Sequence, residues 1–185
     1  MSKSQNMLTL SSWAEASEGE PTVLILEKQL MRTIELHRHV EQARIRLNGE
    51  LTTKTRSLFV GMASELHSFT EMIRKRLESL KTREPHIMNA DASLHWRLFP
   101  ADSADLREQL ESLLCGFAHY GRQTSEANTS LQGLGDTESS QLLGAIFNAV
   151  ERSLWFIEIY LEGLALNADS SRLPDWSGHY VNLRK

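Results

Sequence analysis

Apolar residues recur every three or four positions along four long segments of the chain, and this spacing predicts four amphipathic α-helices. The first stripe is Leu26, Leu30, Thr33, His37, Val40, Arg44 and Leu47, and the second is Phe59, Met62, Leu66, Phe69, Ile73, Leu77 and Leu80. The third is Leu106, Leu110, Leu113, Phe117, Tyr120, Thr124, Ala127 and Leu131, and the fourth is Leu142, Ile146, Ala149, Val150, Leu154, Ile157, Leu161 and Leu164. No run alternates apolar and polar residues for long enough to predict a strand.

Glycine and proline mark the ends of the first two predicted helices. The first spans about 23–48, and Gly49 follows it where a C-terminal cap is expected. The second stops before Pro85, because the residue before a proline disfavours helical geometry. Residues 1–21 lack periodicity and are rich in Ser and Glu, so we expect a flexible N-terminal tail there.

The third and fourth predicted helices start at residues that can cap a first turn. Asp102 or Ser103 is expected to accept the free N–H groups of the third helix. Gly133 and Gly135 break this helix, and Asp136 is expected to cap the fourth.

Four long helices of similar length predict an all-α four-helix bundle over 22–166, followed by a C-terminal tail at 167–185. The longest connection, around 84–101, joins the second and third helices. An antiparallel pair needs only a short link, so this length indicates a crossover, as in ferritin-like bundles.

Composition and charge exclude several classes of protein. The chain has 185 residues and a net charge of −4, so general electrostatic attraction to nucleic acid is not expected. Cys115 is the one cysteine, which excludes an intrachain disulfide and a cysteine-based zinc site, and we expect it to be partly buried and inert. No signal peptide or membrane span is visible in the sequence, which favours the cytoplasm.

Three short motifs follow one another along the predicted helices. They are Glu41-Gln42-Ala43 with Asn48-Gly49; Met72-Ile73 with Arg76; and Leu134-Gly135-Asp136-Thr137-Glu138 followed by Leu154-Trp155-Phe156-Ile157-Glu158. In order and spacing they resemble the Dps branch of the ferritin superfamily, small ferritins that store iron and shield DNA. The resemblance covers about 23–166 and implies a ferritin-like bundle with a short extra helix near 87–94, between helices two and three.

The resemblance also implies an inter-subunit ferroxidase site, but this chain lacks most of its ligands. The family's histidines fall on Arg44 and Arg56, the aspartate after the second histidine falls on Val60, and a further acidic pair falls on Glu71 and Lys75. Arginine has no acceptor and does not deprotonate, so it cannot bind iron as a ligand. Glu71 is the one acid left at these positions that could bind a metal, and no catalytic residue is predicted.

The substituted positions place fixed cations where the family holds a metal ion. Arg44 lies on the predicted apolar stripe, and a partly buried charge needs a partner. We hypothesise that Glu71 pairs with Arg44, Arg56 or Lys75. The alternative is a surface pair of Glu71 with Lys75, contributing about 0.3–0.5 kcal/mol.

The histidines suggest few other metal sites. His37 lies on the predicted stripe, so we interpret it as a core or interface histidine, and the chain has no Glu-x-x-His pair of the kind found in di-iron bundles. A relocated site inside the bundle, combining Glu158 with Glu65 or His37, stays open as an alternative.

Three acidic residues resemble the positions around the family's three-fold pore: Asp136, Glu138 and Glu151. A ring of acids attracts cations. The alternative is structural, because Asp136 can cap a helix and Glu138 favours the helix dipole.

The resemblance implies a homo-oligomer, a shell of twelve subunits. The predicted function is a Dps-like cage that stores or sequesters iron, or protects under stress, with the usual ferroxidase centre lost; iron is possible as cargo. One alternative is a metal-free scaffold that binds a protein partner or co-assembles with a relative, and another is a ferroxidase with a relocated metal site. Neither tail is strongly basic, so DNA binding is expected to be weak or absent.

Overall fold

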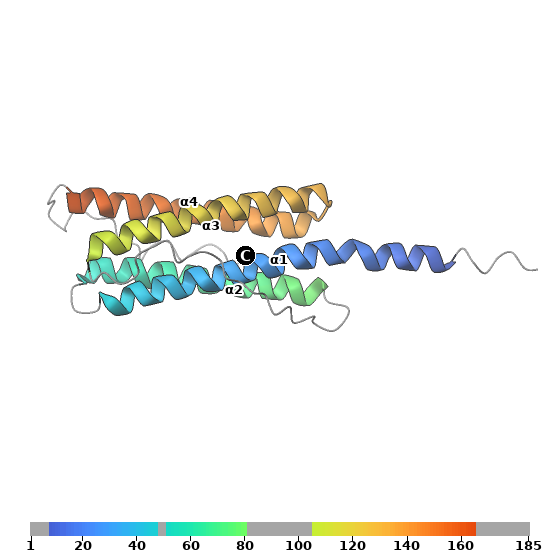
Figure 1. The fold of residues 1–185 in the computed structure, drawn as a ribbon, viewed down its shortest axis with the longest axis horizontal. Coiled ribbons are helices and arrows are strands. Elements are labelled where there is room, and N and C mark those ends of the chain that lie inside the picture. The colour runs from blue at the N-terminus through green and yellow to red at the C-terminus, as the bar shows by residue number, and fades with distance from the viewer. Residues whose placement is uncertain (1–7, 48–50, 81–104, 166–185) are drawn as a thin grey trace, which may run out of the picture.

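The computed structural model describes residues 8–47, 51–80 and 105–165, and side chains are described for 21–47, 51–80 and 105–164. These residues form four helices: α1 (Leu8–Arg46), α2 (Thr53–Leu80), α3 (Leu106–Gly133) and α4 (Thr137–Ala165). Within these ranges there is no strand, and the helices lie alongside one another as a bundle (Figure 1). The all-α four-helix fold predicted from the apolar spacing is confirmed.

Side-chain contacts fix the directions of the helices. The Tyr160 hydroxyl donates to the carbonyl oxygen of Lys54 at 3.2 Å, which joins the end of α4 to the start of α2. Arg76 Nε donates to Ser139 Oγ at 2.8 Å, which joins the end of α2 to the start of α4. Helices α2 and α4 are therefore antiparallel, as are α3 and α4, so α2 and α3 run in the same direction (Figure 1). The end of α2 and the start of α3 therefore lie at opposite ends of the bundle, as the crossover prediction requires.

The core is built from the apolar faces of all four helices. Every predicted stripe position of α2 and α3 is buried, except that Leu80 and Leu106 are half-buried. In α4 the core includes Leu143, Phe156 and Tyr160, which the predicted stripe omits, whereas Leu164 is exposed. Gly121 lies where α3 approaches α4, and a Cβ atom there would come within 3.2 Å of Val150 Cγ1.

The predicted stripe of α1 is wrong at three positions. The buried residues are Gln29, Leu36 and Ala43, and the predicted Leu30, His37 and Arg44 are only half-buried. A helical repeat of 3.6 residues allows both paths along the helix, so spacing alone does not distinguish the path through Leu30 from the path through Gln29. The glutamine lies in the core because it has a hydrogen-bonding partner there.

A buried polar seam joins α1 to α3. Gln29 Nε2 donates to Thr124 Oγ1 at 2.6 Å, and the hydroxyls of Thr33 and Tyr120 lie 2.8 Å apart. These four side chains are fully buried. Burial raises the pKa of Tyr120, although hydrogen bonds from the seam oppose the shift. The seam satisfies Gln29 Nε2 and the three hydroxyls, which would otherwise be costly in the core, whereas Gln29 Oε1 has no hydrogen-bond partner among the described residues. The satisfied groups favour this pairing of the two helices.

Helix α1 begins earlier than the apolar pattern indicates. It starts at Leu8, so residues 8–20, predicted as flexible tail, are helical in the structure, and this part projects beyond the other helices (Figure 1). Pro21 lies inside α1 and is exposed. A proline removes one backbone hydrogen bond and disfavours a helix interior, which is why the sequence pattern places a boundary there.

The start of α3 also differs from the prediction. Asp105 is the N-terminal cap, and its Oδ1 accepts from the backbone N–H of Glu108 at 3.0 Å. The predicted caps, Asp102 and Ser103, lie outside the described residues, as does the extra helix expected near 87–94. An aspartate at either position satisfies the same free N–H groups, so sequence alone does not separate them.

The turn between α3 and α4 matches its prediction. Helix α3 ends at Gly133, and Gly135 has a φ of 76°, a left-handed conformation that favours glycine. Asp136 then caps α4, because its Oδ1 accepts from the backbone N–H of Ser139 at 2.9 Å. None of the described helices is long and apolar enough to cross a membrane.

Candidate functional site

A groove runs along the outer side of the α1–α2 pair. It has a volume of about 420 Å³ and is called the α1–α2 groove below. Its lining residues are His37, Glu41 and Arg44 from α1, and Val60, Ala63, Ser64 and His67 from α2. Two positions at which the resemblance implies iron ligands, Arg44 and Val60, therefore lie in one hollow.

Arg44 has a partner within its own helix. Its Nε and Nη2 atoms donate to Glu41 Oε2 at 3.0 and 2.8 Å. Both side chains are about one-third exposed, so the pair is screened by solvent and its net contribution to stability is small. The opposite charges of Arg44 and Glu41 offset each other, so these two residues add no net charge to the groove.

Glu71 is bound elsewhere. Its Oε1 accepts from Arg74 Nη1 at 2.8 Å, one turn further along α2. The hypothesis that Glu71 pairs with Arg44, Arg56 or Lys75 is therefore wrong within this chain, and so is the alternative pairing with Lys75 alone. Spacing on a helix allows both i+3 and i+4 partners, and the arginine at i+3 is the one in contact.

The remaining substituted positions are spread along α2. Arg56 and Lys75 are exposed. Glu71 lies eleven residues beyond Val60, which is roughly 16 Å along a helix. Of the five positions, Arg44 and Val60 line the groove, and Glu71 and Lys75 lie about three turns or more further along α2.

The relocated site inside the bundle is not formed. Glu65 accepts a hydrogen bond from Ser153 Oγ at 2.8 Å and lies 4.0 Å from Arg152, whereas Glu158 is exposed. His37 faces the groove. Across the described ranges, no three His, Cys, Asp or Glu side chains converge in a way that could hold a metal ion.

Two histidines meet in the groove, which the sequence pattern did not indicate. The ring centres of His37 and His67 lie 6.4 Å apart, with the ring planes inclined at 42°. The predicted apolar stripe of α1 gave no indication of this pair, because it assigned His37 to the core. A stripe running through Leu36 and Ala43 would have turned His37 outward beside α2.

The acidic residues at the start of α4 contact a cation. Arg76 is only 13% exposed; it donates to Asp136 Oδ1 at 2.9 Å, and it also contacts Glu138. Burial opposes ionisation of Asp136, but hydrogen bonds from Ser139 and the charge of Arg76 outweigh it and lower the pKa of the carboxyl. Two of the three predicted pore acids therefore have a neutralising partner in the chain.

The third predicted pore acid lies apart from the other two. Glu151 is exposed on α4, and its position is fifteen residues beyond Asp136, roughly 22 Å along the helix. A single chain therefore brings Asp136 and Glu138 together but not Glu151.

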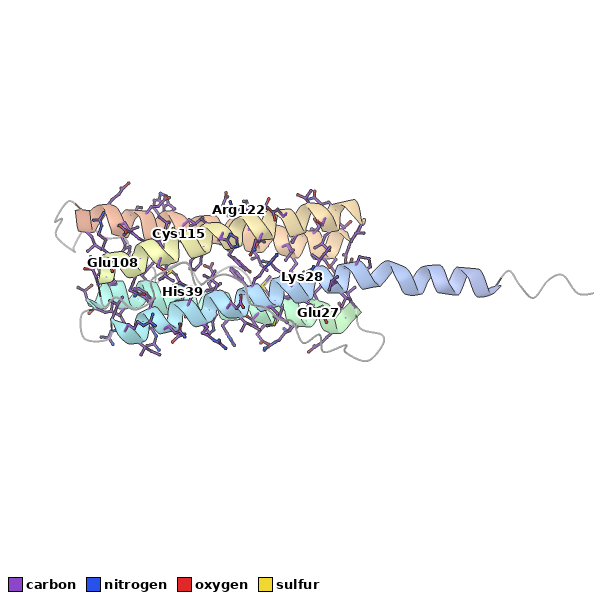
Figure 2. All side chains as sticks on the ribbon, in the orientation of Figure 1. Glu27, Lys28, His39, Glu108, Cys115 and Arg122 are labelled. Atoms are coloured by element: carbon purple, nitrogen blue, oxygen red, sulfur yellow. The ribbon has the colours of Figure 1, made fainter. Side chains whose placement is uncertain are left out.

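Cys115 is exposed on α3, not partly buried as predicted (Figure 2). It lies two positions after Leu113 and two before Phe117, both in the core. Two helical positions amount to about 200° of rotation, which turns the thiol to the solvent side.

His39 lies on α1 (Figure 2). It contacts Ser112 on α3 and is expected to make stability depend on pH. Its Nε2 lies 3.1 Å from Ser112 Oγ, and burial, with a smaller effect of the Arg46 charge, lowers its pKa below 6.5. The unfolded chain therefore takes up this proton first as pH falls. The contribution of His39 to the free energy of unfolding should therefore be fully present above about pH 6.5 and decline as the pH falls below that value.

Replacing this imidazole by an amide tests the pH dependence. His39→Gln should flatten the decline of the unfolding midpoint between about pH 7 and pH 5, measured by urea denaturation. His119 also has a lowered pKa but is more exposed, so His119→Gln should flatten it less. Equal slopes for the parent and His39→Gln would contradict this assignment.

The comparisons with known proteins support the fold. No protein-family model matches the chain. Among solved structures, a mutant of Mycobacterium smegmatis Dps1 is similar, with a TM-score of 0.69 and 17% sequence identity. The match covers 78% of this chain and 97% of that one. The chain therefore has the ferritin-like four-helix fold of Dps proteins, as the motifs implied.

Proposed function

We propose that this chain is the subunit of a Dps-like shell in the cytoplasm that stores or sequesters iron, or protects under stress, and that the usual inter-subunit ferroxidase centre is lost. The observation that carries the proposal is the composition of the α1–α2 groove in a bundle with the Dps fold. Arg44 and Val60 lie there, where the resemblance implies a histidine and an aspartate.

The chemistry of the groove supports a loss of iron oxidation at these positions. An arginine offers no lone pair to a metal and repels a cation, and valine has no ligand atom. The carboxylate nearest to Arg44 is Glu41, and both hydrogen bonds from the guanidinium go to its Oε2. A hard cation such as Fe²⁺ favours several oxygen or imidazole donors, and the five family positions retain one acid.

Exposed apolar side chains support assembly into an oligomer. Ile45 on α1 and Val60 on α2 are 65% and 49% exposed, and Trp155 on α4 is 55% exposed. Large apolar groups in contact with water are a cost that a subunit interface removes. The proposed assembly is a twelve-subunit shell. DNA binding is proposed to be weak or absent, because the chain carries a net charge of −4.

Native mass and iron loading test this proposal together. The expected result is a hollow twelve-subunit particle that takes up iron supplied already oxidised or together with an active relative. A monomer or dimer that takes up no iron would contradict it and favour a metal-free scaffold. Mass spectrometry of the intact assembly gives the first quantity, and iron content after gel filtration gives the second.

A further inference from the structure

Two imidazoles, one from each helix, face one another in the α1–α2 groove. His37 on α1 and His67 on α2 have ring centres 6.4 Å apart. Both line the same hollow, which opens to solvent and has room for an ion with its water. Neither residue is among the positions at which the resemblance implies iron ligands.

The separation of the rings is close to that of two imidazoles on one metal ion. An imidazole nitrogen lies about 2.0–2.1 Å from a bound Zn²⁺, so two histidines on one tetrahedral ion place their ring centres roughly 5 Å apart. The observed 6.4 Å is longer than this, so binding an ion requires the two rings to move closer together. Both side chains line an open groove, which leaves room for that movement.

The ring nitrogens of this pair are available. Within the described part of the chain, neither His37 nor His67 forms a hydrogen bond to another residue. By contrast, His39 is hydrogen-bonded to Ser112, and His119 Nδ1 lies 3.0 Å from Arg122 Nη2. An imidazole with a free lone pair binds metal without first breaking a protein contact.

The charges around the pair permit a cation. The Arg44 guanidinium is the one positive group lining the groove, and Glu41 offsets it at 2.8 Å. Both hydrogen bonds from Arg44 go to Oε2 of this carboxylate, which leaves Oε1 outside that pair. Glu41 follows His37 by four residues, so it is on the same side of α1 and lowers the cost of placing a cation near the imidazole.

We propose that His37 and His67 bind a divalent ion of the Zn²⁺ class, with water completing its coordination. Two imidazoles without a carboxylate ligand favour Ni²⁺, Cu²⁺ or Zn²⁺ over Mg²⁺ or Ca²⁺. The bound ion links α1 to α2 across the groove and stabilises their packing, because it binds the folded chain alone. Both proposed ligands come from one chain, so the site does not depend on iron storage, and the proposed assembly would cover the side of α1 and α2 on which it lies.

The test uses Zn²⁺ alone, added to the metal-free full chain in whatever assembly it forms. Isothermal calorimetry should show saturable binding with about one equivalent of Zn²⁺ per chain. His37→Asn and His67→Asn should each weaken that binding by about tenfold or more. His119→Asn is the matched control, since it removes an imidazole outside the groove, and it should bind like the parent.

Thermal denaturation with and without Zn²⁺ gives a second readout. Zn²⁺ should raise the Tm of the parent and of His119→Asn, but not of the two groove variants, whose metal-free circular dichroism should match the parent. Unchanged Zn²⁺ affinity in both groove variants would overturn the proposal, because the ion would then be held by histidines elsewhere. Absence of saturable binding to the parent would also overturn it. Neither result bears on shell assembly, which native mass measures separately.

Discussion

Truncating Tyr120 to alanine is expected to lower the free energy of unfolding by about 3–5 kcal/mol. Tyr120 is among the largest fully buried side chains. It is 0% exposed and lies between α1 and α3. Its removal leaves a cavity where the two helices meet and takes away the partner of the Thr33 hydroxyl. Urea denaturation followed by circular dichroism measures the loss.

Tyr120→Phe separates packing from hydrogen bonding at the same position. The ring stays in place and only the hydroxyl is lost, so the expected cost is about 1 kcal/mol. The Thr33 hydroxyl keeps its bond to the carbonyl oxygen of Gln29 at 2.8 Å, which limits the effect. A phenylalanine variant as unstable as the alanine variant would mean that the polar seam, and not the packing of the ring, holds α1 against α3.

Replacing Arg76 by alanine is expected to cost about 2–3 kcal/mol. The guanidinium joins the end of α2 to the start of α4 through Ser139, Asp136 and Glu138. The side chains of Arg76 and Asp136 are only 13% and 14% exposed, so the variant leaves the carboxylate poorly solvated and without its cation. Denaturation of the parent and variant at neutral pH gives the difference.

A matched control is two residues away. Arg74 forms an exposed pair with Glu71, so Arg74→Ala should change stability by no more than about 0.5 kcal/mol. A cost similar to that of Arg76→Ala would contradict the assigned role of the interhelical cluster.

The Arg76 effect should also depend on pH in the acid range. The pKa of Asp136 is lowered in the folded chain, so the stability linked to its ionised form is present above pH 3.8. It is lost as pH falls through the folded-state pKa. The difference between the parent and Arg76→Ala should therefore shrink below about pH 3.8. A difference that stays constant down to pH 2 would contradict this linkage.

Periodicity predicted the helices best where the core positions are apolar. The stripes of α2 and α3 match the buried residues because Phe59, Leu66, Leu113 and Phe117 leave one path along each helix. In α1 the core contains Gln29, whose burial depends on Thr124 almost a hundred residues later. A long-range hydrogen bond of this kind has no local signature, so the sequence pattern selected the neighbouring path.

The candidate site was predictable in part. The family resemblance pointed to Arg44 and Val60, and the structure places both in the α1–α2 groove. The pairing of His37 with His67 was not predictable, because it depends on how α1 is rotated against α2. Residues of different motifs contact one another in the fold. Arg76 belongs to the second motif and Asp136 to the third, and they form an ion pair between α2 and α4.

The proposed loss of the ferroxidase centre can be measured by the peroxide-driven oxidation of Fe²⁺ with the purified, metal-free assembly. We expect an oxidation rate equal to that of buffer, because Arg44, Arg56 and Lys75 are cations at positions where the resemblance implies ligands, and Val60 offers no ligand atom. The protein should be compared at equal subunit concentration with a Dps protein that has the full ligand set. A rate equal to that of the active Dps protein would contradict the loss of the ferroxidase centre.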